Sequence, residues 1–239
     1  MVLPQGMTLD ELRRSRGSFS DAIGLPPEVY SDAEFHRFEM EAVFSGEWLC
    51  VGRQEQIPDP GDYLAVTRAG EPLIVVRAAD GSIRVMSAVC RHRGMCITAS
   101  VDRGDDDMFD PPDFESGSTR QFRCPYHSWV FDLDGQLIGA PEMSRTDDFD
   151  MTEVRLPSLA VETWNGFVFA NFDHDAAPLG PRLAQLDAVL ANYDVASLVT
   201  GDPVTIPAFA LNWQIMMVNF MEMYHNSRRH QGNHAFAPS

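Results

Sequence analysis

The sequence predicts an α+β chain in which a helix precedes an all-β domain and further helices follow it. Short apolar runs separated by Gly, Pro and Asp extend from about residue 48 to residue 172, which is typical of antiparallel strands. Helical spacing of apolar residues occurs before and after this stretch. No βαβ pattern or phosphate-binding glycine-rich loop competes with the all-β interpretation.

The first predicted helix covers about residues 32–46. Ser31 followed three residues later by Glu34 has the pattern of a capping box. The apolar residues that then recur at helical spacing are Phe35, Phe38 and Ala42. We therefore expect a helix that begins after Ser31 and buries one apolar face.

Three turn dipeptides divide the β region into hairpins. Each ends in Gly and lies between two apolar runs that resemble strands, a combination typical of two-residue hairpin turns. The dipeptides are Asp80-Gly81, Asp134-Gly135 and Asn165-Gly166. They predict a small antiparallel barrel or sandwich.

One stretch of the β region does not resemble a strand. Residues 98–121 are acidic, rich in Pro and Gly, and show no sustained apolar period. We predict a long surface loop here. Because the entropy of loop closure grows slowly with length, the segments before and after it can still meet.

Two helices are predicted beyond the β region. The first follows a proline-containing linker and places Leu183, Leu186 and Leu190 on one face. The second covers about residues 212–230 and starts at Asn212, a favourable N-cap residue.

These elements divide the chain into three parts. They are an N-terminal segment with a helix at 1–44, a β domain at 45–173, and the beginning of a second domain at 174–239. We expect this second domain to be incomplete.

The composition excludes some classes of function. A formal charge of −17 would repel nucleic acid and anionic membrane surfaces. No apolar stretch is long enough for a membrane span, and the N-terminus lacks the apolar core of a secretory signal, so we expect a cytoplasmic protein. Four cysteines are too few for the disulfide framework of a small secreted protein, which makes metal binding the better hypothesis.

Four residues have the spacing of a metal site. Cys90-x-His92 and Cys124-x2-His127 put one thiolate and one imidazole on each of two loops. A [2Fe–2S] cluster with two Cys on one iron and two His on the other needs this ligand set. Structural zinc also accepts two Cys and two His, but zinc fingers pair Cys with Cys and His with His along the chain.

The sequences around these ligands resemble those of a known family. VCRHRG, CPYHSWVFDLDG, EWLCVGRQEQIPDPGDYL and ETWNGFVFANFD are similar to the Rieske domain of Rieske non-haem iron oxygenases of the aromatic ring-hydroxylating type. Tyr126 stands where respiratory Rieske proteins carry a disulfide-forming Cys. Cys96 has no partner for such a disulfide, and we interpret it as a small buried hydrophobic residue.

A second stretch, NWQIMMVNFMEMYHNSRRH, resembles the start of the catalytic domain in the same family. The resemblance implies that His225 and His230 bind a mononuclear Fe(2+), as in sites with two His and one carboxylate. It also implies that Glu222 is the electron-transfer bridge to His127 of the next subunit. A five-residue step turns about 140° on an ideal helix, so both histidines can bind one metal only if the helix is distorted or ends between them.

The resemblance implies a function for the whole assembly. It is a dioxygenase or monooxygenase that takes electrons from NAD(P)H through a reductase or ferredoxin. O2 is activated at the mononuclear iron to hydroxylate or demethylate a small aromatic or quaternary amine substrate, for example in aromatic hydrocarbon catabolism. A head-to-tail homotrimer and a helix-grip catalytic domain are also implied.

Two alternatives stay open. The third iron ligand of the family, a carboxylate, is not found in this sequence, so we expect a truncated catalytic domain and a chain that is catalytically incomplete alone. The chain is alternatively a non-catalytic Rieske electron carrier that lacks a working mononuclear site. The sequence does not identify the substrate.

Overall fold

A computed structural model of the chain describes residues 3–4, 6–18, 20–98, 114–201, 210–221, 225–230 and 232. The chain forms two compact units. One consists of Met1–Glu39 with Val204–Ser239, and the other of Met40–Pro203. None of the helices among these described residues is long and apolar enough to cross a membrane.

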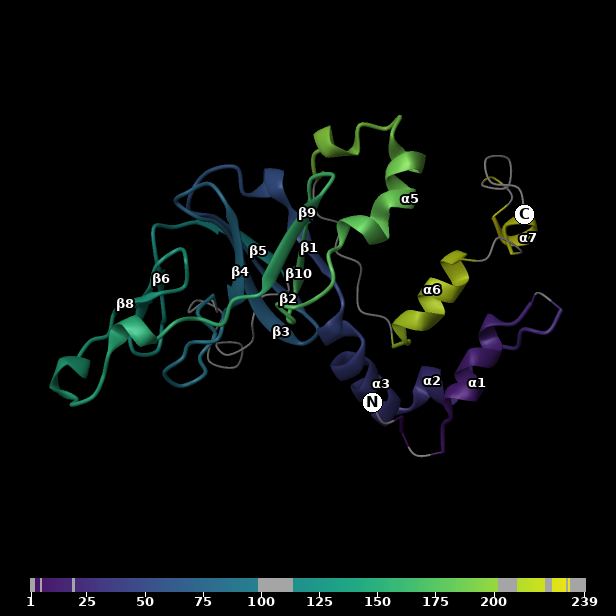
Figure 1. The fold of residues 1–239 in the computed structure, drawn as a ribbon, viewed down its shortest axis with the longest axis horizontal. Coiled ribbons are helices and arrows are strands. Elements are labelled where there is room, and N and C mark those ends of the chain that lie inside the picture. The colour runs from purple at the N-terminus through teal and green to yellow at the C-terminus, as the bar shows by residue number, and fades with distance from the viewer. Residues whose placement is uncertain are drawn as a thin grey trace. The chain divides into compact units, whose positions relative to one another are not determined.

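The first unit contains short helices from both ends of the chain (Figure 1). They are α1 (Leu9–Arg13), α2 (Glu28–Ser31), α3 (Ala33–Ala42, which runs on into the second unit), α6 (Trp213–Met221) and α7 (Asn226–Arg229). Gln214 Nε2 donates a hydrogen bond to the buried carboxylate of Glu39, so α6 is tied to α3 within this unit.

The predicted first helix is present, but its cap differs from the prediction. Asp32 Oδ1 accepts hydrogen bonds from the backbone N–H groups of Glu34 and Phe35, at 2.7 and 2.9 Å. Ser31 is the last residue of α2, and its hydroxyl donates to the carbonyl of Pro27. The prediction of a capping box at Ser31 was therefore wrong. The carboxylate of Asp32 accepts hydrogen bonds from the free N–H groups of α3 instead.

The second unit is built on three antiparallel sheets, each with strands adjacent in the order given (Figure 1). The first holds β1 (Leu49–Arg53), β10 (Phe167–Asn171) and β9 (Ala160–Trp164). The second holds β4 (Ile83–Ser87), β3 (Glu71–Arg77), β2 (Asp62–Arg68) and β5 (Phe114–Ser118). The third holds β6 (Phe122–Arg123), β7 (Val130–Phe131) and β8 (Leu137–Gly139). The predicted antiparallel β domain is confirmed.

All three predicted hairpins are present. Asp80-Gly81 lies between β3 and β4, Asp134-Gly135 between β7 and β8, and Asn165-Gly166 between β9 and β10. In the last turn Trp164 pairs with Phe167, and both central residues have positive φ, 47° and 84°. Two positive φ values match the twist of a two-residue hairpin, which explains the choice of Asn and Gly.

The loop predicted at 98–121 contains a strand. Residues 114–118 form β5, which pairs with β2 so that Ser116 lies opposite Leu64. Residues 99–113 lie outside the described residues. The prediction failed at β5 because an edge strand gains its hydrogen bonds from one neighbour and needs no apolar alternation.

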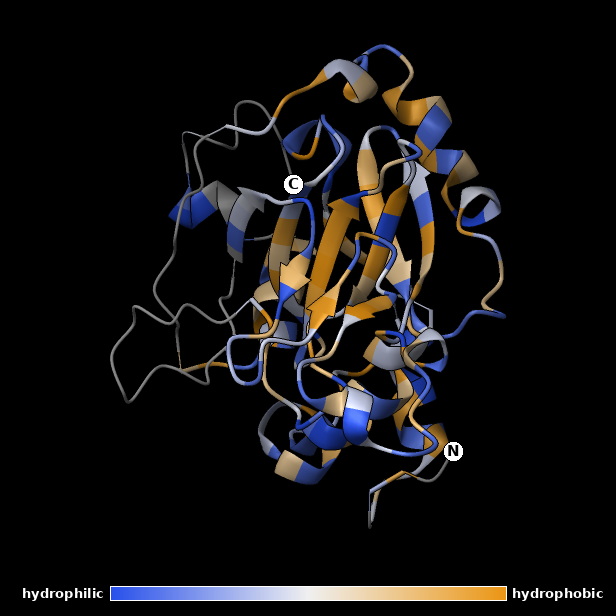
Figure 2. Cartoon of the chain, turned by 90° about the vertical axis from the view of Figure 1, so that its left-hand side faces the viewer, coloured by the Kyte–Doolittle hydropathy of each residue, from blue (hydrophilic) through white to orange (hydrophobic). Residues whose placement is uncertain are grey.

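Strand β3 separates two hydrophobic cores. Leu73 and Val75 contribute to one core, and Ile74 and Val76, on the opposite face, contribute to the other. Because side chains alternate along a strand, β3 is buried on both faces, and Figure 2 shows hydrophobic colour concentrated on the strands. The second core also contains the cysteines of the predicted metal site.

Helix α5 (Gly180–Leu190) confirms the helix predicted after the linker. It is attached to the β domain through Asp187, which accepts hydrogen bonds from Trp164 Nε1 at 2.7 Å and Asn165 Nδ2 at 3.2 Å. Residues 174–201 therefore belong to the same compact unit as the sheets. The division of the chain at residue 173 stays a prediction.

Candidate metal centre

The two predicted ligand loops have the same backbone hydrogen bonds. The first ligand loop, residues 90–95, follows β4, and the second, residues 124–129, connects β6 to β7. The N–H of Cys90 donates to the carbonyl of Met95 at 2.8 Å, and the N–H of Cys124 donates to that of Trp129 at the same distance. Each loop therefore closes on its own cysteine five residues later.

A second hydrogen bond in each loop joins residues four apart. Gly94 N–H donates to Cys90 O and Ser128 N–H donates to Cys124 O, both at 3.0 Å. Gly94 and Ser128 have φ values of 72° and 58°, which reverse the chain just after the histidines. Ser is strained in this left-handed region, whereas Gly is not.

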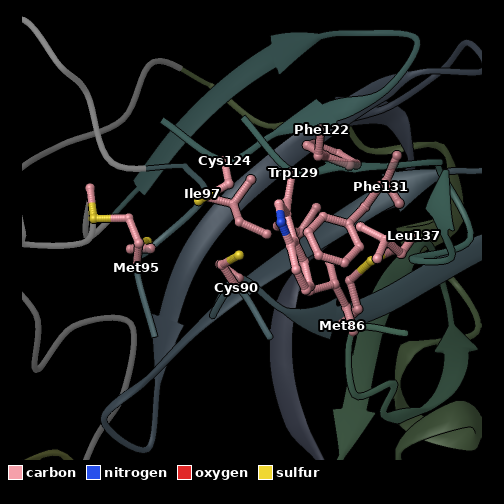
Figure 3. Packing of buried hydrophobic residues seen from close by; sticks show 14 residues of the cluster. Met86, Cys90, Met95, Ile97, Phe122, Cys124, Trp129, Phe131 and Leu137 are labelled. Carbon is pink, nitrogen blue, oxygen red and sulfur yellow. The ribbon is translucent and has the colours of Figure 1, made fainter. Parts of the chain in front are cut away.

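The thiols of Cys90 and Cys124 lie together in the core. Both residues are 2% exposed and belong to the same hydrophobic core. Figure 3 shows them among the apolar side chains of the second core. Burial, with a further contribution from Cys124, raises the pKa of Cys90 to about 11. A metal cation would compensate the charge that burial disfavours on these sulfurs.

The imidazoles of His92 and His127 also form a pair. Their ring centroids are 4.6 Å apart, with an interplanar angle of 65°. His92 is half-buried and its Nδ1 has no hydrogen-bond partner, whereas His127 is exposed. Burial, followed by His127 and Arg93, lowers the pKa of His92. A neutral imidazole with a buried, unpartnered nitrogen is suited to bind a metal.

This pairing fits a two-iron cluster. Thiol lies beside thiol and imidazole beside imidazole, as required when one iron takes two Cys and the other two His. A tetrahedral zinc ion would need all four side chains around one centre.

The histidines of the predicted mononuclear iron site both lie in the first unit. His225 precedes α7 and His230 follows it, and their ring centroids are 5.3 Å apart at 78°. Residues 213–221 and 226–229 of the helix predicted at 212–230 are helical. Helix α7 ends between the two histidines, which is the condition that allows histidines five residues apart to approach one metal. The proposed bridge, Glu222, lies outside the described residues.

The chain is similar to known proteins over most of its length. The Rieske [2Fe-2S] domain family matches residues 47–160. The oxygenase subunit of glycine betaine monooxygenase from Pseudomonas aeruginosa is 32% identical over 224 residues, which cover 93% of this chain and 47% of that protein. This chain is a homologue of the Rieske oxygenase α subunits. The α subunit of chlorobenzene dioxygenase from a Cupriavidus strain is 35% identical over 175 residues, 72% of this chain and 36% of that protein.

Solved Rieske oxygenases have the same fold. The quaternary ammonium Rieske monooxygenase CntA in complex with L-carnitine has a TM-score of 0.74 and 27% identity, with 90% of this chain and 57% of that chain covered. Naphthalene 1,2-dioxygenase from Rhodococcus sp. gives a TM-score of 0.75 and 27% identity, covering 95% and 49%. The chain thus spans about half the length of the Rieske oxygenases that it matches.

The remaining cysteines of this Rieske domain homologue are not paired. Cys96 is 6% exposed with its sulfur 3.4 Å from Thr98 Oγ1, which confirms the interpretation as a small buried residue. Cys50 is exposed and free.

The sequence interpretation missed one residue beside the Rieske ligands. The indole of Trp129 stacks on His92, with centroids 4.7 Å apart and planes 8° from parallel. The signal in the sequence was an aromatic residue two positions after His127, which looks like an ordinary core residue until the loop geometry is known.

Proposed function

We propose that this chain is the electron-accepting part of a terminal oxygenase component. The observation that carries the proposal is that Cys90 and Cys124 lie in one buried core while the rings of His92 and His127 contact each other. When bound, a cluster with these ligands accepts and releases one electron, at a potential of about −150 to +300 mV in Rieske centres. Such a potential allows the cluster to accept electrons that come from NAD(P)H through a reductase or ferredoxin. We place this electron transfer in the cytoplasm.

The cysteines and histidines of the two ligand loops have different roles in electron transfer. The buried cysteines are shielded from water in the second core, while His127 is exposed and offers an edge through which electrons can enter or leave. Tyr126 packs against His127 with ring centroids 3.8 Å apart and is itself 58% exposed. We place the contact with redox partners on this exposed side of the loops.

The second site extends the proposal to catalysis. His225 and His230 would hold Fe(2+) together with a carboxylate ligand. Glu222 would connect this site to His127 of the next subunit in a head-to-tail homotrimer. Inter-subunit electron transfer is described for a quaternary ammonium Rieske monooxygenase of similar structure. The chain would then serve O2-dependent hydroxylation or demethylation of a small organic substrate.

The relatives narrow the substrate class to two candidates. Similar proteins include carnitine monooxygenase and benzene 1,2-dioxygenase subunits, which by name act on a quaternary amine and on an aromatic hydrocarbon. The glycine betaine and carnitine monooxygenase subunits align over 93% and 87% of this chain, against 84% for the benzene 1,2-dioxygenase subunit, so we favour a quaternary amine.

Anaerobic reconstitution of the chain with iron and sulfide tests the proposal. We expect two irons and two sulfides per chain at the Rieske domain, visible absorption, and a rhombic EPR signal after reduction. Cys124→Ser should abolish the signal, whereas Cys96→Ser, a matched change at a buried cysteine outside the ligand set, should retain it. One bound zinc per chain with no visible absorption would refute the proposal.

A further inference from the structure

Each proposed histidine ligand contacts its own aromatic residue from the second ligand loop. Trp129 stacks on His92 at 4.7 Å and 8°, and Tyr126 packs on His127 at 3.8 Å and 39°. Aromatic ring pairs contribute about 0.5–1.5 kcal/mol beyond the area they bury. The two imidazoles are therefore held by different partners.

Trp129 is fixed independently of the histidine. It is 5% exposed and belongs to the second core, where Figure 3 shows it near Cys90 and Cys124. Its ring lies 5.6 Å from that of Phe149, and its carbonyl accepts the hydrogen bond that closes the second ligand loop. A side chain held on several sides can impose an orientation on its neighbour.

His92 is the ligand that needs such support. Its loop is exposed on both sides of it, at Arg91 and Arg93, and its buried Nδ1 has no hydrogen-bond partner that would fix the ring. Two rings among the described residues contact this imidazole: the exposed His127 meets it at 65°, and the buried indole of Trp129 lies parallel to its plane.

We propose that Trp129 is a positioning residue for His92: its indole holds the imidazole plane with Nδ1 shielded from water and directed for iron. This inference rests on the proposed function, because it assumes a cluster at the four ligands. A residue of the second ligand loop, Trp129, would thus orient a ligand of the first loop, His92.

Two substitutions of Trp129 distinguish its effect on the orientation of His92 from its packing in the core. Trp129→Phe keeps a flat ring that can stack, whereas Trp129→Leu keeps the apolar character and loses the stack. Phe131→Leu is the matched control, since Phe131 is fully buried in the same core and its ring has no contact with a histidine among the described residues.

The reconstituted chain is compared by EPR after reduction and by the rate at which a chelator removes the cluster. We expect Trp129→Leu to shift the g values and to speed cluster loss about 2- to 10-fold, the range that one lost stacking contact allows. Trp129→Phe and Phe131→Leu should keep the g values of the parent. Equal changes in Trp129→Leu and Phe131→Leu, or none in Trp129→Leu, would overturn the proposal.

A measurement on the metal-free chain distinguishes this proposal from the proposed function. The indole should shift the ring-proton NMR signals of His92 upfield, and Trp129→Leu should abolish that shift while Phe131→Leu retains it. If the parent chain binds no cluster, the proposed function fails, and the NMR result still decides whether Trp129 orients His92. An unshifted His92 signal in the parent would refute the positioning role by itself.

Discussion

Arg53 shows how one residue can join distant segments of the second unit. It is only 8% exposed, and its guanidinium donates hydrogen bonds to the carbonyls of Val195 and Leu198, at 3.1 and 2.6 Å. It also pairs with Glu55 at 3.1 Å and lies 4.4 Å from the ring centroid of Phe167. A buried charge with this many partners is satisfied, and loss of it would leave several polar groups unpaired.

Glu55 extends this link to Thr200 and gives it a dependence on pH. Its carboxylate accepts hydrogen bonds from the backbone N–H and hydroxyl of Thr200, at 2.8 and 2.6 Å. Burial acts to raise the pKa of Glu55, but the hydrogen bonds from Thr200, with the charge of Arg53, outweigh it, so the pKa lies below its ordinary value.

Thr200→Val should therefore destabilise the chain in a pH-dependent way. A lowered folded-state pKa stabilises the fold fully above the unfolded value of about 4.3, and this contribution is lost as the pH falls through the folded value. We expect the variant to lower the free energy of unfolding by about 1–2 kcal/mol at pH 7 and by progressively less below pH 4 in denaturant titrations. Thr163→Val, at an exposed position of β9, should show no such trend. A deficit that does not change between pH 7 and pH 3 would contradict this role of Glu55.

At the scale of elements, the sequence predicted what local chemistry decides. The three hairpins follow from turn residues that tolerate positive φ, and β3 follows from its apolar run. The cap at Asp32 and strand β5 depended on competition between neighbouring residues and on pairing with a distant strand. A local pattern does not contain that information.

The Asn165-Gly166 turn offers a test of element packing. A Cβ at Gly166 would come within 2.6 Å of the Arg53 guanidinium, whereas a Cβ at Gly81 meets nothing within 4 Å. Both glycines have φ near 80°. Gly81→Ala should therefore cost about 1–2 kcal/mol for backbone strain alone.

Gly166→Ala should cost more, about 2–4 kcal/mol, since it also displaces the hydrogen bonds of Arg53. Thermal or denaturant unfolding of both variants measures the difference. If the two substitutions proved equally costly, the contact between the turn and Arg53 would not matter for stability.

At the scale of the whole molecule, the proposed ligands were predictable from motif spacing, but their arrangement was not. Spacing gave Cys90, His92, Cys124 and His127, whereas the stacking of Trp129 depends on the positive φ of the residue before it. The approach of His225 to His230 depends on the end of α7 at Arg229, whereas the sequence predicted helix up to about residue 230.

Counting irons tests the second site. Titration of the reconstituted chain with Fe(2+) should add a third iron, held weakly because two imidazoles leave most positions to water. His230→Ala should reduce the count to two and leave the EPR signal of the cluster unchanged, and His174→Ala is a control outside both sites. A parent chain that stays at two irons with excess Fe(2+) would favour the non-catalytic electron carrier.

The division of the ligands between two loops determines whether folding or cofactor insertion comes first. Thirty-one residues, including β5, separate His92 from Cys124, and each loop supplies one sulfur and one nitrogen. Because each iron needs a ligand from both loops, neither loop alone can capture one, and a newly made chain gains the site only when its sheets bring the loops together. We therefore expect cofactor insertion to be a late step of biogenesis, which follows folding and does not nucleate it.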